Sequence, residues 1–191
     1  MVTTITVISD TSGLNSTSTS STNGLSLSLS LGSTTYQPGQ DVSIAVDEKN
    51  ALSTINNVTA TTNFSSEFMS GFTNDPSPLP FGIAVLQGNY TLSNYSTVTP
   101  LIIYDPSKVY IGTQVVGPTS YSFQPLSDTA ALNGGDYNSS NGLKMQYEIN
   151  VNGYWPNNAS TTSTNFDPGV YTVVAGDEWG ALVVLHFTVS Q

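Results

Sequence analysis

The sequence predicts an all-β protein, an immunoglobulin- or pilin-like antiparallel β-sandwich with an extended strand at its N-terminus. Three observations indicate this class. Short segments in which apolar and polar residues alternate recur along the 191-residue chain, and a period of two is that of β-strands. Turn-forming Gly, Pro and Asn separate these segments. Good helix formers are scarce, because 27 Ser and 25 Thr supply much of the polar surface and disfavour helices.

The chain opens with a strand-prone segment that is followed by a polar stretch. Residues 2–9 are β-branched at almost every position, a composition typical of strands. Residues 10–24 contain one apolar residue and are rich in Ser, Thr and Gly, which is typical of a linker. We therefore divide the chain into an N-terminal strand at 1–12, a Ser/Thr-rich linker at 13–24 and a β-sandwich domain at 25–191.

The first segments of the domain predict an antiparallel pair of strands. Leu25–Leu31 alternates Leu with Ser, which places its leucines on one face. A turn around Pro38 and Gly39 follows, and residues 42–46 alternate again. Residues 47–50 (DEKN) indicate the turn that ends this strand. A Ca²⁺ site at this turn would need more oxygen ligands than the segment supplies.

The rest of the chain predicts further strands and a closing hairpin. The expected strands are 55–63, 81–87, 98–104, 109–116, 119–124 and 143–151, with loops at 71–80 and 133–142. The hairpin joins strands at 168–175 and 181–189 through a tight connection at 176–180. Both of its strands are apolar on both faces, which favours a central position in a sheet.

Composition excludes several classes of function. With three Lys, no Arg and a net charge of −10, the chain cannot neutralise a phosphate backbone, so it is not expected to bind nucleic acid. No apolar run is long enough to span a bilayer. The absence of Cys and the single His exclude disulfides and the common zinc sites. We expect no metal and no cofactor.

Seven N-x-S/T sequons predict a glycosylated surface protein. Composition alone would produce about 4.6 of them, so seven is a modest excess. The sequons begin at Asn15, Asn57, Asn63, Asn89, Asn94, Asn138 and Asn158. We expect N-linked glycans on them and an extracellular location. No signal peptide is visible, and we expect that it has been removed.

Few residues indicate catalysis. His186 lies on a predicted strand, where a packed or edge histidine is the usual occupant, and no G-x-S-x-G elbow accompanies it. Asp177 and Glu178 could serve a glycosidase, but adjacent residues on a turn rarely converge on one bond. We therefore expect that the chain is not an enzyme. A secreted hydrolase that uses these three residues is the third alternative.

Aromatic residues leave a binding function open. Trp155 and Trp179, together with ten Tyr, could form a platform on which sugars stack. The same residue types are also common in the cores of β-sandwiches. A monomeric cell-surface adhesin or carbohydrate-binding sandwich is therefore the second alternative.

The strand-prone opening segment suggests an assembly mechanism. An apolar strand on a polar linker either folds back into its own sheet or inserts into a neighbouring copy. Insertion from head to tail produces an open filament, as in the donor-strand complementation of pilins. Burial of three or four of Val2, Ile5, Val7 and Ile8 would contribute about 5–12 kcal/mol. A variant of this hypothesis makes Leu25–Leu31 the inserted strand.

The closing segment PGVYTVVAGDEWGALVVLHFTV is similar to the ends of surface proteins from Sulfolobus-like thermoacidophilic archaea. With the opening strand, the sequons and the size, the chain resembles the subunit of the archaeal thread. This resemblance implies β-sandwich subunits, heavy glycosylation and head-to-tail joining through an N-terminal donor strand. By position, the donor residues would be Val2, Thr3, Thr4, Ile5, Thr6, Val7, Ile8 and Ser9.

We therefore expect a structural subunit of an extracellular, glycosylated, pilus-like filament that supports adhesion or biofilm. Its partners would be identical subunits. The sequence does not indicate which groove would receive the donor strand.

Overall fold

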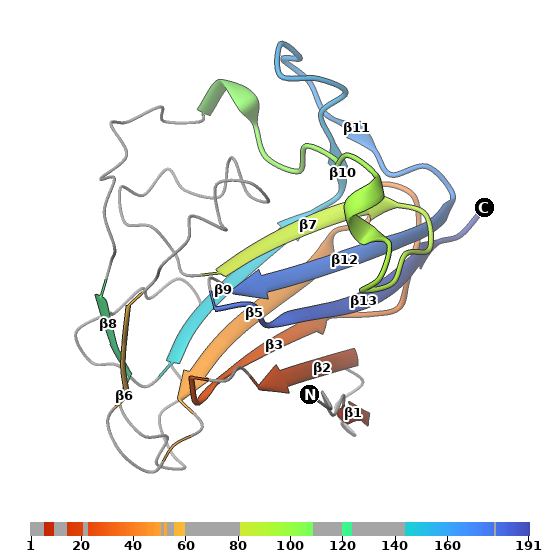
Figure 1. The fold of residues 1–191 in the computed structure, drawn as a ribbon. Coiled ribbons are helices and arrows are strands. Elements are labelled where there is room, and N and C mark those ends of the chain that lie inside the picture. Colours follow the sequence, from red (N-terminus) through yellow and green to blue (C-terminus); the bar gives the residue numbers. More distant parts are fainter. Residues whose placement is uncertain are drawn as a thin grey trace.

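A computed structural model describes residues 6–9, 15–20, 23–50, 52, 56–59, 81–108, 120–123, 144–177 and 179–191. These residues form strands, turns and two short 3₁₀ segments, η1 (Tyr95–Thr97) and η2 (Pro106–Lys108). The predicted all-β class is confirmed, and all but one of the paired strands run antiparallel (Figure 1). None of the helical segments in the described ranges has the length or apolar character to cross a lipid bilayer.

The larger sheet has five strands in the order β1-β2-β3-β5-β9. They are β1 (Thr6–Ser9), β2 (Asn15–Ser20), β3 (Leu25–Leu31), β5 (Val42–Asn50) and β9 (Lys144–Val151). The predicted alternation in β3 is confirmed, because its four leucines are buried and its serines are half-buried. β3 pairs on both sides within its own chain, so we do not pursue it as a donor strand.

The second sheet has four strands in the order β4-β13-β12-β7. They are β4 (Thr35–Tyr36), β7 (Phe81–Gln87), β12 (Gly169–Asp177) and β13 (Leu182–Val189). β12 is central, as predicted for the closing hairpin, and is buried from Tyr171 to Asp177. β13 differs from the prediction, because β4 covers its outer side at only two positions, Thr188 and Val189.

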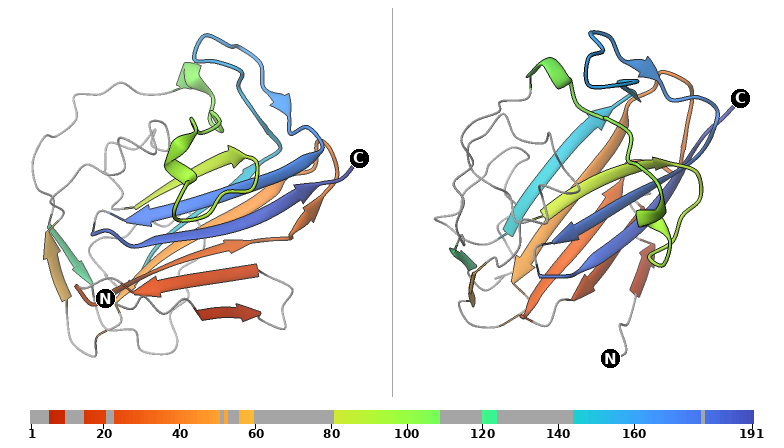
Figure 2. Two further views of the ribbon diagram at one scale, coloured as in Figure 1. Left: turned by 45° about the vertical axis from the view of Figure 1, so that its right-hand side comes forward. Right: turned by 45° about the horizontal axis from the view of Figure 1, so that its top comes forward.

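The two sheets pack against each other around one apolar core, as the views in Figure 2 show. β13 lies against β2 and β3 of the larger sheet. The leucines of β3 and alternate residues of β5 contribute one side of the core, and β7, β12 and β13 contribute the other. At one end, Tyr171 stacks on Phe187 at 5.0 Å, and Phe166 packs against both rings.

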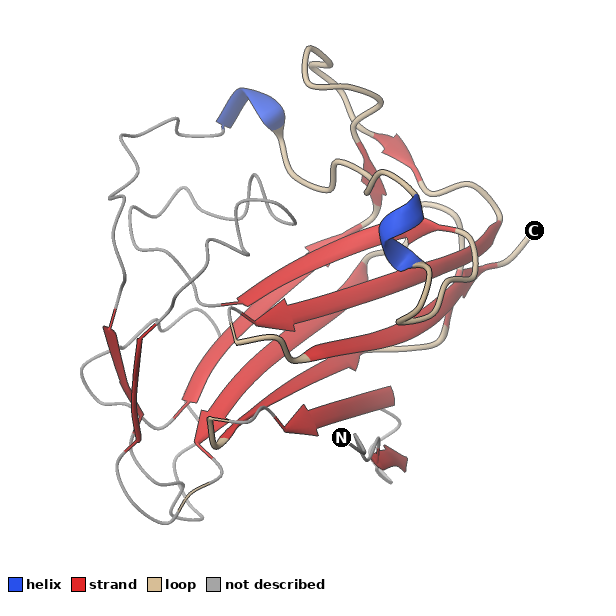
Figure 3. Cartoon of the chain, viewed as in Figure 1, coloured by secondary structure: helices blue, strands red, loops and turns tan. Residues whose placement is uncertain are grey.

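Two smaller strand pairs lie outside these sheets (Figure 3). β6 (Asn56–Thr59) pairs with β8 (Ser120–Phe123), and β10 (Gly153–Tyr154) pairs with β11 (Thr164–Asn165). Both members of the first pair fall within strands predicted from the sequence, at 55–63 and 119–124.

The sequence-based reading was wrong in three places. Asn15–Ser20 forms strand β2 and not a linker, because its backbone pairs with β3 along the whole segment. The segment 98–104 is a loop with one isolated bridge, at Ile102, and Pro100 interrupts its capacity to donate hydrogen bonds. Residues 47–50 continue β5 and do not form a turn. Predictions for 71–80, 109–116 and 133–142 lie outside the described residues.

Candidate functional site

The outer side of β13 carries a row of backbone groups, and its residues from Leu182 to Phe187 are buried or half-buried. Thr188 N–H donates to Thr34 O at 2.8 Å, so the even-numbered residues of β13 direct their backbone groups away from β12. Among the described residues, no strand pairs with Leu182, Val184 or His186 on this side. Their N–H and C=O groups form an edge to which another strand can add. We call Leu182–Phe187 the open edge.

The opposite edge of this sheet is covered differently. Leu101 N–H, from the loop that carries η1, donates to Val85 O on the outer side of β7 at 2.8 Å. The same loop bridges to Trp155 through Ile102. The open edge of β13 is therefore the better candidate for strand addition.

Alternate side chains of the open edge face the core. Val183 and Phe187 are buried, and Leu185 packs against the core. A strand added here would place alternate residues over the same core. The edge is about 20 Å long, at about 3.3 Å per residue, which suits the predicted donor segment Val2–Ser9.

The N-terminal segment itself lies at the margin of the larger sheet. Within the described range Thr6–Ser9, it pairs antiparallel with Asn15–Ser20 of its own chain. The sequence hypothesis instead placed this strand in a neighbouring subunit. The physical reason for self-pairing is proximity, because a short connection brings the two strands together at little entropic cost. Residues 1–5, with Val2, Thr3, Thr4 and Ile5, lie outside the described residues.

His186 has a structural role next to the open edge. Its Nε2 lies 2.8 Å from the carbonyl oxygen of Tyr90, to which it donates. Thr172, its register partner on β12, donates to Gly88 O at 2.7 Å and accepts from Tyr90 N–H at 2.9 Å. These bonds hold residues 88–90 over the sheet. His186 and the Thr172 hydroxyl group therefore both bond to the backbone of this segment.

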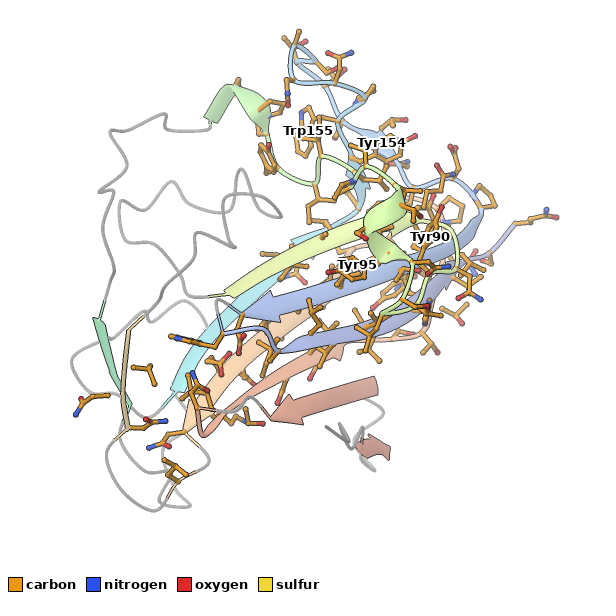
Figure 4. The ribbon with its side chains drawn as sticks, viewed as in Figure 1. Tyr90, Tyr95, Tyr154 and Trp155 are labelled. Carbon is orange, nitrogen blue, oxygen red and sulfur yellow. The ribbon has the colours of Figure 1, made fainter. Side chains whose placement is uncertain are left out.

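The two tryptophans do not share one platform. Trp155 follows β10, whereas Trp179 lies in the turn after β12, so they occupy opposite ends of the sheets. Tyr154 stacks towards Phe166 of the core at 6.2 Å. Figure 4 shows Tyr90 and Tyr95 near η1, apart from Trp155. Trp155 and Trp179 therefore do not stack on one sugar together.

Two carboxyl groups are buried at the other end of the core. Glu48 on β5 and Asp177 at the end of β12 are both 0% exposed. Asp177 Oδ1 accepts from Trp179 N–H at 2.9 Å and from Ala181 N–H at 2.7 Å, which closes the hairpin turn. Asp177 Oδ2 and both oxygens of Glu48 have no hydrogen-bond partner among the described residues.

The environment of these groups opposes their ionisation. Burial raises the pKa of Glu48 well above its usual value, and the charge of Asp177 raises it further. Burial also raises the pKa of Asp177, although the backbone donors of its turn act in the opposite direction. The sequence-based reading missed Glu48, although Glu48 continues the alternation of Val42, Ile44 and Val46 and so faces inward. It also misplaced Asp177 as a polar turn residue.

The described sequons lie on the surface. Asn57, Asn89, Asn94 and Asn158 are exposed. Asn94 accepts from Thr91 N–H through Oδ1 at 2.7 Å, which leaves the amide nitrogen available for a glycan. Asn15 begins β2. Asn63, Asn138 and the Glu178 side chain lie outside the described residues.

Comparisons with known proteins identify no family. No family model and no curated protein matches the chain. Among solved structures, a β-glucosidase from Listeria innocua in complex with gluconolactone aligns with a TM-score of 0.37 and 9% identity. The same enzyme with glucose aligns with a TM-score of 0.34 and 12% identity. Each alignment covers 86% of this chain but 16% of the enzyme, and similarity at this level supports no argument.

Proposed function

We propose that this chain is a structural subunit of an extracellular, glycosylated filament, and that subunits join from head to tail by strand exchange. The N-terminal strand of one subunit leaves its own β2 and adds to the open edge of β13 in the next. The observation that carries this proposal is that, within the described residues, no strand pairs with Leu182, Val184 or His186 on the outer side of β13, and the terminal strand β1 pairs with β2 alone. Such a filament would serve adhesion or biofilm formation.

The exchange has a favourable balance of contacts. Within the described residues, self-pairing of β1 involves the four residue pairs from Thr6↔Ser18 to Ser9↔Asn15. The open edge would engage Val2–Ser9, and three of its residues have N–H and C=O groups that pair with no described strand. Each backbone bond contributes about 0.5–1.5 kcal/mol. Exchange of a terminal element between identical copies is a low-cost route to assembly.

The surface supports an extracellular location. The four exposed sequons can carry N-linked glycans without disturbing the core. Only 8% of residues are charged, so hydroxyl, amide and glycan groups would provide solubility. The positions of His186 and Asp177, one bonded to a carbonyl group and one buried, favour a role without catalysis.

Electron microscopy and light scattering of two purified forms test the proposal. The complete chain is expected to form filaments. A chain that lacks residues 1–9 is expected to stay folded and monomeric, and a synthetic peptide of residues 2–9 should bind to it. Filaments from the truncated chain would contradict the proposal.

One observation favours a second candidate, a monomeric cell-surface adhesin. β1 already has a partner in its own chain, which satisfies part of its backbone without a neighbour. This candidate requires the complete chain to remain monomeric by light scattering at every concentration tested.

A further inference from the structure

Two buried carboxyl groups, those of Glu48 and Asp177, lie at one end of the core. The two carboxyl groups come from facing sheets, β5 and β12, and both are fully buried. Leu27 on β3 and Met145 on β9 are the register neighbours of Glu48, and Phe81 on β7 is that of Asp177. These three register neighbours of the pair are therefore apolar residue types.

No cation compensates these carboxyl groups within the described side chains. Lys49 lies next to Glu48 in the sequence but pairs with Asp47 at 3.8 Å. Lys144 pairs in register with Lys49 and not with Glu48, and the chain contains no Arg. Among the described side chains, Asp177 is the charged group that acts on Glu48. A buried carboxylate without a partner is far costlier than its neutral acid.

A metal ion is a weaker explanation than a proton. Calcium takes six to eight oxygen ligands, and no group of three or more Asp, Glu or His residues gathers anywhere in the described ranges. Asn50, which shares the inner face of β5, already uses its side-chain oxygen to accept from Leu52 N–H at 2.9 Å. A protonated carboxyl needs no such shell.

We propose that Glu48 and Asp177 hold at least one proton in the folded protein, and that loss of this proton at higher pH loosens the contact between the two sheets. Protonation of one carboxyl group makes it neutral and removes its repulsion with the other. The inference is independent of filament assembly, because it concerns the fold of a single subunit.

The direction of the pH dependence follows from the raised pKa values of both groups. The folded protein binds more protons than the unfolded chain above the usual carboxyl pKa of about 4. The contribution to stability is therefore complete below pH 4 and is lost as the pH rises through the folded-state pKa values. Ordinary surface carboxylates show the opposite trend.

Urea unfolding of the complete chain between pH 3 and pH 9 tests this proposal. The wild type should unfold at progressively lower urea concentrations as the pH rises, whereas Glu48→Gln should remove most of this shift. Glu148→Gln, at an exposed position on β9, is the matched control and should behave as the wild type. An equal pH dependence of wild type and Glu48→Gln would overturn the proposal.

Two further measurements keep the test decisive. If Glu48→Gln does not fold, Asp177→Asn retains the oxygen that accepts from the turn and should reduce the pH dependence in part. Infrared spectra at pH 6 should show a protonated carboxyl band in the wild type that Glu48→Gln lacks. Stabilisation of the wild type, but not of Glu48→Gln, by CaCl₂ at pH 7 would identify a cation site and contradict the proposal.

Discussion

The variant Val184→Pro tests the role of the open edge in assembly without disturbing the fold of the subunit. Val184 directs its N–H away from β12, and no described residue accepts from it. Proline lacks this N–H and is tolerated on edge strands. Val184→Pro should therefore fold but should block the addition of a neighbour's strand. Val184→Thr retains the N–H and serves as the control.

The magnitude follows from the hydrogen bonds that the edge offers. Leu182, Val184 and His186 present about six backbone groups, and bonds to them would contribute about 3–9 kcal/mol to each joint. Proline removes one bond and leaves a neighbour's carbonyl group unsatisfied, which costs about 1–3 kcal/mol. Because 1.4 kcal/mol corresponds to a factor of ten, the critical concentration should rise about 10- to 100-fold.

Sedimentation of assembled material over a range of protein concentrations measures this change. Circular dichroism and urea unfolding of the monomer verify that Val184→Pro is folded. Val183→Pro provides a contrast, because it removes a bond to Ala175 within the sheet and should destabilise the monomer by about 3 kcal/mol or more. Equal critical concentrations for Val184→Pro and Val184→Thr would refute the assignment of β13 as the acceptor.

Three further changes test the fold around the edge. Leu29→Ala removes a fully buried side chain and should lower the free energy of unfolding by about 2–5 kcal/mol in urea; a change below 1 kcal/mol would contradict its place in the core. His186→Ala removes the bond to Tyr90 O and should speed amide hydrogen exchange at 88–90, with other loops unchanged. Gly153→Ala places a Cβ against the Thr164 carbonyl group. It should therefore abolish the protection of the β10 and β11 amides from hydrogen exchange, and retained protection would contradict that close approach.

Strands with strong alternation could be predicted from the sequence alone. Leu25–Leu31 specifies its buried face directly, because a shift of one residue would expose all four leucines. The central position of β12 was predicted because apolar residues on both of its faces require cover, and the strand is buried at successive positions. The incomplete pairing of β13 was not predicted. β4 has only two residues, so it covers only the end of β13, and the sequence does not indicate where β4 begins and ends.

Other features depend on pairing that the sequence does not show. Asn15–Ser20 has no apolar residue, so its strand structure comes from backbone bonds to β3 and not from burial of its own side chains. The segment 98–104 is largely apolar, but Pro100 within it lacks the N–H group that a strand uses to pair with its neighbour. Glu48 follows the inward phase of β5, yet its charge suggested a surface turn. Asp177 lies far from Glu48 in the sequence, and only the packing of the two sheets brings the two residues together.

Disulfide cross-linking in assembled material tests strand exchange most directly. The chain contains no Cys, so introduced pairs are unambiguous. A mixture of subunits with Val7→Cys and subunits with Val184→Cys should give disulfide-linked pairs of subunits after mild oxidation. In the same assembled state, the single-chain pair Val7→Cys/Thr17→Cys, which are register partners within one subunit, should cross-link poorly. Complete cross-linking within single chains, with no linkage between subunits, would contradict the account.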